Sequence, residues 1–140
     1  MPADLVAVAG ALGGVILGHL LSYLAVRSAK DREWRLSLAR DEITSRQKLY
    51  AEFLAEAQEV VTRSMNQKSS DPSILNAVNS RFAEITLFSP DAVIERAKLI
   101  ADYALTCHSK EGPKQGSNFY LLKSEFIKAA KAHIDSFRRV

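Results

Sequence analysis

A stretch near the start of the chain, residues 5–26, carries no acidic or basic side chain apart from His19, and it constrains the fold more than any other feature. A helix rises about 1.5 Å per residue, so the stretch is roughly 33 Å long, close to the roughly 30 Å hydrocarbon core of a membrane. Leu, Val and Ile dominate it, and each favours insertion. The sequence therefore predicts one transmembrane helix, with residues 1–27 as the transmembrane segment and a short outer N-terminus.

Two alternatives for this stretch are a cleaved signal peptide and a helix buried in a globular core. Residues 1–4 carry no positive charge, and the apolar stretch exceeds the roughly 7–15 residues of a signal peptide's hydrophobic region. A core helix seldom runs so far without a group that forms a salt bridge. An uncleaved membrane helix is therefore the favoured interpretation.

The charges that flank the stretch predict its orientation. Only Asp4 precedes it, whereas basic residues follow it closely, and these are Arg27, Lys30, Arg32, Arg35 and Arg40. The positive-inside rule then predicts an inner-membrane protein with its N-terminus outside and its C-terminus in the cytoplasm. We expect the membrane interface to be occupied by an aromatic ring and the nearest basic side chains, which are Tyr23, Arg27, Lys30, Arg32 and Arg35.

Small residues recur at every fourth position of the stretch, and these are Gly10, Gly14, Gly18 and Ser22. They share one helical face, where they allow two backbones to approach closely. The pattern indicates helix packing with a second copy or with another membrane protein, although glycine is also common in membrane helices without such a role. His19 lies beside this row and is the one titratable group of the span. It either bonds a neighbour or a lipid headgroup, or it serves a proton-linked or pore function.

The rest of the chain has the pattern of a helical domain. No glycine or proline occurs between Gly18 and Pro72, so the first helix can extend to about residue 66, although a break near Ser28 stays open. Asp71-Pro72 and Ser89-Pro90 resemble helix starts, and residues 109–117 resemble a loop. The expected helices of the 28–140 domain cover about 28–66, 72–88, 90–107 and 118–138. The predicted fold is all-α, with one N-terminal transmembrane helix continuing into a cytoplasmic antiparallel bundle.

Apolar residues at helical spacing predict the core of this bundle. On the first two helices they are Ile43, Tyr50, Phe53, Leu54, Ala57, Val60, Val61, Ile74, Val78, Phe82 and Ile85. On the last two they are Val93, Ala97, Ile100, Ala101, Ala104, Leu105, Phe119, Leu122, Phe126, Ala130, Ile134 and Phe137.

The usual catalytic and phosphate-binding motifs do not occur in the sequence. Cys107 and His108 are adjacent, so on a helix they diverge by about 100° and cannot readily share one ion. His133 has no carboxylate at metal-site spacing, and Glu52, Glu56 and Glu59 have the pattern of a solvated acidic face. One cysteine permits no internal disulfide. We therefore expect no catalytic residue, metal or cofactor, and no enzyme.

Nucleic acid is also excluded as a partner. The net charge is only +3, and acidic residues alternate with basic ones along the chain. The aromatic residues lie at core spacing, which leaves no stacking platform for bases. The expected partners are membrane lipid, a second copy bound through the transmembrane helix, and a protein partner.

Two segments carry a resemblance, residues 45–61 (SRQKLYAEFLAEAQEVV) and residues 85–104 (ITLFSPDAVIERAKLIADYA). They resemble a broad group of small uncharacterised bacterial membrane-anchored helical proteins. The shared positions are a helix start and a helix junction, here Arg46, Tyr50, Phe53 and Leu54, then Leu87, Phe88 and Ser89. The resemblance covers about a third of the chain. It implies a bacterial or phage origin and a helical hairpin architecture, and it supplies no activity.

Two functional hypotheses follow. The first is a non-catalytic single-pass membrane protein whose helical bundle binds a partner or assembles at the membrane. The second is an oligomeric membrane-permeabilising or gating component, such as a phage-type lysis or exclusion protein, in which the glycine row and His19 line a pore. A domain as large as residues 28–140 argues against the second hypothesis, because a pore former does not need it.

Overall fold

The computed structural model describes residues 2–66, 71–109, 112, 116 and 118–139, with side chains from residue 14 onward. Within these residues every regular element is an α-helix, so the all-helical prediction is confirmed. The helices are α1 (Pro2–Asn66), α2 (Ile74–Phe88), α3 (Asp91–His108) and α4 (Phe119–Arg138). Helix α1 continues through Ser28 without a break.

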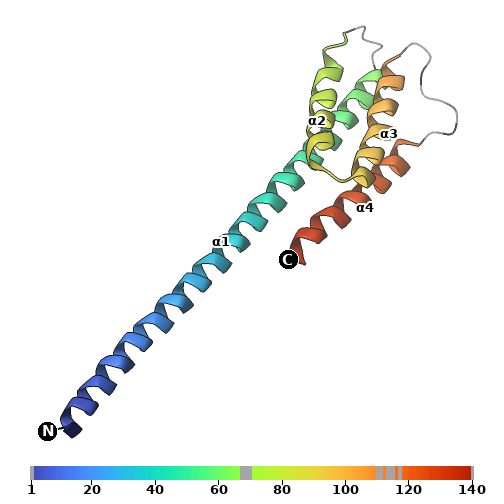
Figure 1. Ribbon diagram of the computed structural model, residues 1–140. Coiled ribbons are helices and arrows are strands. Elements are labelled where there is room, and N and C mark those ends of the chain that lie inside the picture. Colours follow the sequence, from blue (N-terminus) through green and yellow to red (C-terminus); the bar gives the residue numbers. More distant parts are fainter. Residues whose placement is uncertain (1, 67–70, 110–111, 113–115, 117, 140) are drawn as a thin grey trace. The chain divides into compact units, whose positions relative to one another are not determined.

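The chain divides into two compact units, Met1–Asp41 and Glu42–Val140. The first unit is helical throughout its described residues, and each side chain from residue 14 to residue 38 is exposed. The second unit contains the C-terminal part of α1 together with α2, α3 and α4. Successive helices of this second unit run in opposite directions, which gives an antiparallel bundle (Figure 1).

The core of the bundle draws one large, fully buried side chain from each of its helices. These side chains are Phe53, Ile85, Ile100 and Phe126. The rings of Phe53 and Phe126 lie with their centroids 5.5 Å apart. Burying a side chain of this size stabilises a fold by roughly 1.5–3 kcal/mol. Among the described residues the buried set contains only hydrophobic side chains, so apolar packing holds the bundle together.

Local hydrogen bonds determine where the helices begin and end. The Asn118 side chain accepts a hydrogen bond from the Tyr120 backbone N–H and caps α4. Ser89, expected to begin a helix, instead ends α2, because its backbone N–H donates to the Ile85 carbonyl at 2.9 Å. Pro90 then takes the N-cap position of α3, with extended backbone angles.

The predicted membrane location is wrong, because none of the described helices could cross a membrane. In the part of the chain whose side chains are described, no helix has an apolar run long enough to cross a membrane. Of the predicted span at residues 5–26, only residues 14–26 belong to that part, and charged residues recur from Arg27 onward. Residues 14–26 measure about 20 Å along a helix, whereas a membrane span requires roughly 30 Å. The predictions of an inner-membrane location, of an N-terminus outside and of a single-pass protein are therefore wrong.

Candidate functional site

The first unit presents an apolar surface, formed by residues 14–26 and called here the apolar segment. Its large side chains are 52% to 66% exposed, and they are Val15, Ile16, Leu17, Leu20, Leu21, Tyr23, Leu24 and Val26. Because consecutive residues point about 100° apart on a helix, this surface extends around the whole circumference. A helix that is hydrophobic on all sides is normally a buried helix. The apolar segment is therefore a candidate contact surface.

The small residues of the predicted packing row lie on this segment without a neighbour. A Cβ atom added at Gly14 or Gly18 would meet nothing within 4 Å, and Ser22 and His19 are both exposed. Gly10 lies outside the residues whose side chains are described. Within this chain, then, the described face of the row is open to a partner.

The side chains predicted at a membrane interface are all exposed as well, and these are Tyr23, Arg27, Lys30, Arg32 and Arg35. Their predicted interfacial role depended on the predicted membrane span. Apolar side chains interrupt the charged stretch, and Trp34, Leu36 and Leu38 are each at least half exposed. The apolar surface of the first unit thus extends beyond residue 26.

In the bundle, the Tyr50 hydroxyl links three parts of the fold. It is hydrogen-bonded to Ser89 Oγ at 2.8 Å and to His133 Nδ1 at 2.7 Å. The Tyr50 ring is buried and packs edge-on against Phe126, with centroids 5.7 Å apart. These contacts join α1, the junction between α2 and α3, and α4. We call Tyr50, Ser89 and His133 the tyrosine network.

The tyrosine network is composed of neutral groups near pH 7. Burial raises the pKa of the Tyr50 phenol, although the hydrogen bond with Ser89 and the charge of Arg46 act in the opposite direction. Burial lowers the pKa of the His133 imidazole, and Arg46 lowers it further, while Glu42 opposes both effects. Arg46 also pairs with Glu42 and lies 5.0 Å from the centroid of the Phe88 ring.

A second polar cluster surrounds Arg81 on α2. Its guanidinium lies 2.8 Å from Glu52, 3.5 Å from Glu56 and 2.9 Å from Glu84. Glu52 and Glu56, expected as part of a solvated acidic face, are therefore partly buried and share one arginine with Glu84. The guanidinium offsets part of the negative charge between α1 and α2, so the cluster has the character of a structural contact.

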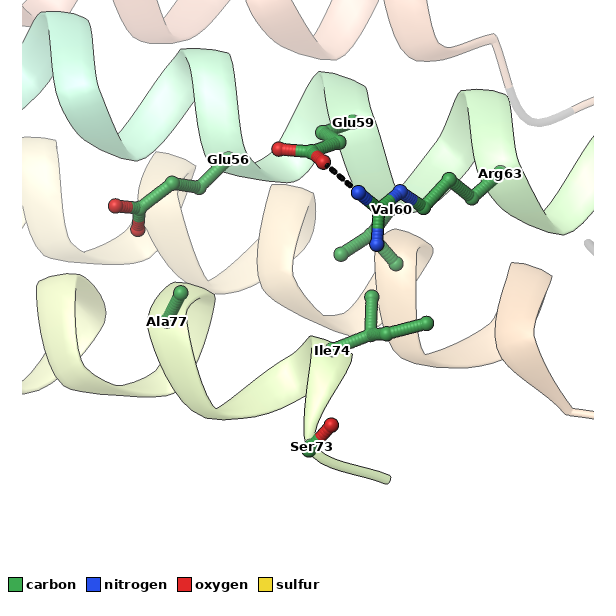
Figure 2. A pocket seen from close by; sticks show the side chains of 7 residues that line it. All are labelled: Glu56, Glu59, Val60, Arg63, Ser73, Ile74 and Ala77. Carbon is green, nitrogen blue, oxygen red and sulfur yellow. Dashed lines mark ion pairs between the residues drawn. The ribbon is translucent and has the colours of Figure 1, made fainter. Parts of the chain in front are cut away.

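Several hollows lie on the bundle surface, and three of them are described by the residues that line them. One of about 250 Å³ lies between α1 and α2, where Glu59 pairs with Arg63 at 2.5 Å and Ile74 faces Val60 (Figure 2). Another of about 250 Å³ lies beside Arg46 and Arg81. The third, about 490 Å³, lies among α1, α3 and α4. We call the third hollow the aromatic cavity, and its lining includes Gln58, Met65, Tyr103, Asn118, Phe119 and Tyr120.

Metal and thiol chemistry find little support among the described side chains. No group of three His, Cys, Asp or Glu side chains in that part of the chain is arranged to hold a metal ion. Cys107 is half-buried, and burial raises the pKa of its thiol despite a hydrogen bond with Tyr103. A raised pKa reduces the thiolate fraction, which makes Cys107 a weak nucleophile.

Comparison of the chain with protein-family models, with curated proteins and with solved structures gave no match. The resemblance carried by residues 45–61 and 85–104 thus stays a prediction.

Proposed function

We propose that the chain is a non-catalytic helical assembly module, in which the apolar segment packs against the same segment of a second copy. One observation carries the proposal. The described side chains of residues 14–26 are exposed on every side of α1, and most of them are hydrophobic. Apolar surfaces of this extent are characteristic of interaction sites.

A second copy is the partner that fits the row of small residues. Two-fold pairing brings the same face of each copy together, so Gly14 and Gly18 of one helix meet the corresponding face of the other. Without a Cβ atom, these positions allow the two backbones to approach closely and bring the flanking Leu, Val and Ile side chains into contact. The bundle of the second unit is then carried as a folded domain on each member of the assembly.

The energetic balance predicts reversible association. Fully burying a large apolar side chain gains roughly 1.5–3 kcal/mol, and these side chains are already about half covered by their own helix. Covering four of them on each of two copies then gains roughly 6–12 kcal/mol. The loss of free motion on association costs about 4–15 kcal/mol. The two terms are similar in size, so we expect assembly to depend on the concentration of the chain.

Crosslinking of the full chain in intact cells, followed by mass identification of the adducts, tests the proposal. We expect a discrete self-adduct that Gly14→Leu abolishes, because the added side chain holds the two backbones apart. Leu20→Phe is the matched control, since it adds bulk on the opposite face of the same helix and should leave the adduct in place. The absence of a self-adduct, or a self-adduct that Gly14→Leu leaves in place, would contradict the proposal.

The membrane-permeabilising alternative requires a membrane span, and the described helices contain none. Binding of a separate protein by the bundle is compatible with assembly, and the same crosslinking experiment detects it as a foreign adduct.

A further inference from the structure

The tyrosine network has at its centre a hydroxyl group with a single proton and two hydrogen-bonding neighbours. Tyr50 Oη lies 2.8 Å from Ser89 Oγ and 2.7 Å from His133 Nδ1. A phenol donates one hydrogen bond, so Tyr50 donates to one of these neighbours and accepts from the other. The hydrogen bonds of the network can therefore run in two directions. The network belongs entirely to the second unit, whereas the apolar segment belongs to the first.

Acidity and basicity decide the direction while His133 is neutral. A phenol loses its proton with an ordinary pKa of about 10, which makes it a good donor. Imidazole binds a proton with an ordinary pKa of about 6.5, so its free nitrogen is a better acceptor than a serine oxygen. Tyr50 therefore donates to His133 Nδ1 and accepts from Ser89. The proton of the neutral imidazole then lies on Nε2, because Nδ1 must offer its lone pair.

Protonation of His133 reverses this order. Both nitrogens of a charged imidazole are donors, so Nδ1 then donates to Tyr50 Oη. The Tyr50 proton turns to Ser89 Oγ, which becomes an acceptor, and the serine proton turns away from the network. A hydroxyl proton rotates about its C–O bond, so the reversal needs no displacement of a heavier atom. The buried Tyr50 side chain keeps both partners in each state, which avoids the cost of an unsatisfied polar group.

Groups on the packed elements around His133 determine which state is populated. Burial opposes the charged imidazole, as does Arg46 from α1, whereas Glu42 from α1 favours it. The phenol of Tyr50, also from α1, and the hydroxyl of Ser89, from the junction between α2 and α3, are both neutral near pH 7. The neutral imidazole is therefore the dominant state at pH 7, and acid populates the charged one.

We propose that the tyrosine network is a proton-operated hydrogen-bond switch, in which protonation of His133 on α4 converts Ser89 from a donor into an acceptor. Tyr50 transmits the change across the bundle, which stays folded in both states. In acid, the Ser89 hydroxyl proton becomes available to a group outside the network. A proton bound on α4 thus changes the hydrogen-bonding character of the junction between α2 and α3.

Imidazole ¹⁵N NMR of the full chain tests the switch, because the shifts of the two ring nitrogens identify both the tautomer and the charge. The chain has 3 histidines, and His133→Gln assigns the relevant signals by removing them. At about pH 8 we expect the proton of neutral His133 on Nε2. Below the titration midpoint of His133 we expect both nitrogens to be protonated. Nuclear Overhauser effects between the rings of Tyr50 and Phe126, which pack edge-on, should persist in both states.

Two substitutions separate the two directions of the network. Tyr50→Phe removes the donor to Nδ1, so we expect neutral His133 to become a mixture of tautomers. Ser89→Ala keeps that donor and the single tautomer, but it removes the acceptor that Tyr50 needs when His133 is charged. We therefore expect Ser89→Ala to lower the titration midpoint of His133 by about 0.5 pH unit. Ser124→Ala, at an exposed serine of α4, is the matched control and should leave the midpoint in place.

A proton on Nδ1 of neutral His133 would overturn the proposal, because Tyr50 would then donate to Ser89 in both states. Loss of the contact between Tyr50 and Phe126 on protonation would also overturn it, since the helices would then separate instead of exchanging donors. The same holds for a titration midpoint that Ser89→Ala leaves unchanged or that Ser124→Ala lowers equally.

Discussion

The Tyr50 hydroxyl lies 2.8 Å from Ser89 Oγ and 2.7 Å from His133 Nδ1, although these residues are 39 and 83 positions away in the sequence. Each hydrogen bond in such a network contributes about 0.5–1.5 kcal/mol, and a partner left unsatisfied by its loss costs more. One hydroxyl group thus stabilises the contacts among three parts of the bundle.

Removing that hydroxyl isolates its contribution. In Tyr50→Phe the ring keeps its edge-on packing against Phe126, but Ser89 and His133 lose a common partner. We expect the free energy of unfolding to fall by about 1–2 kcal/mol, measured by urea denaturation. The control is Tyr120→Phe, which removes an exposed hydroxyl and should change stability by less than about 0.5 kcal/mol. Equal effects of the two substitutions would show that the network contributes nothing specific.

His133 makes the stability of the bundle depend on pH. Burial, reinforced by Arg46 and opposed by Glu42, holds its pKa below the ordinary value of about 6.5 that applies when the chain is unfolded. The unfolded chain therefore binds the proton more readily. The stability contributed by neutral His133 is present above about pH 6.5 and is lost as the pH falls through the lower folded-state pKa.

We expect thermal unfolding measured from pH 7.5 down to pH 5 to show this loss, and His133→Gln to reduce the slope. His108→Gln is the control, because His108 lies outside the tyrosine network, and it should retain the slope of the unmodified chain. A pH dependence that His133→Gln leaves unchanged would assign the effect to other groups.

At the scale of the helices, charge compensation between α1 and α2 depends on Arg81. Glu52, Glu56 and Glu84 all lie within 3.5 Å of its guanidinium. We expect Arg81→Gln to lower the free energy of unfolding by about 1 kcal/mol, because the side chains are about one-third exposed and water screens their charges. Added salt should recover part of this loss by screening the remaining carboxylates. A loss that does not respond to salt would indicate packing rather than charge.

The start of α4 depends on one capping side chain. Asn118 Oδ1 accepts a hydrogen bond from the Tyr120 backbone N–H at 2.9 Å. We expect Asn118→Ala to cost about 1 kcal/mol of stability and Asn118→Asp to retain most of it, since aspartate also caps helices. Circular dichroism during thermal unfolding measures both. Equal stability of the Ala and Asp variants would rule out a capping role.

Most of the fold prediction was based on helical periodicity, and Leu105 is a residue that was wrongly placed in the core. The buried residues of α3 follow a spacing of three and four, and these are Val93, Ala97, Ile100 and Ala104. Leu105 comes one position after Ala104, about 100° further around the helix, and is 56% exposed. Its apolar character suggested a core position, but its angle on the helix excludes it. Ser89 was misplaced similarly, because the residue that ends α2 directly precedes the N-cap residue of α3.

The polar contacts could not be predicted in the same way. Tyr50 was expected in the core through its ring, but Ser89 and His133 become its partners only when α1, the α2–α3 junction and α4 pack together. The Arg81 cluster likewise joins α1 with α2. Periodicity locates the buried face of one helix and contains no information about which helix lies opposite.

At the scale of the whole molecule, the two units differ in whether they bury their hydrophobic side chains. The bundle of the second unit encloses a core of hydrophobic side chains, whereas the described part of the first unit leaves its hydrophobic side chains exposed. The apolar composition of residues 5–26 suggested a membrane span, but composition alone does not distinguish a helix covered by lipid from one covered by another helix. The proposed self-association buries these exposed side chains against a second copy.

Disulfide scanning of the apolar segment shows which face of the helix lies between two copies. In a Cys107→Ser background, single cysteines are placed at Gly14, Gly18 and Ser22 on one face, and at Ile16 and Leu20 on the opposite face, and oxidation in intact cells is followed on non-reducing gels. We expect disulfide-linked dimers at the first set and little dimer at the second. Equal crosslinking around the helix, or none at any position, would contradict assembly through this face.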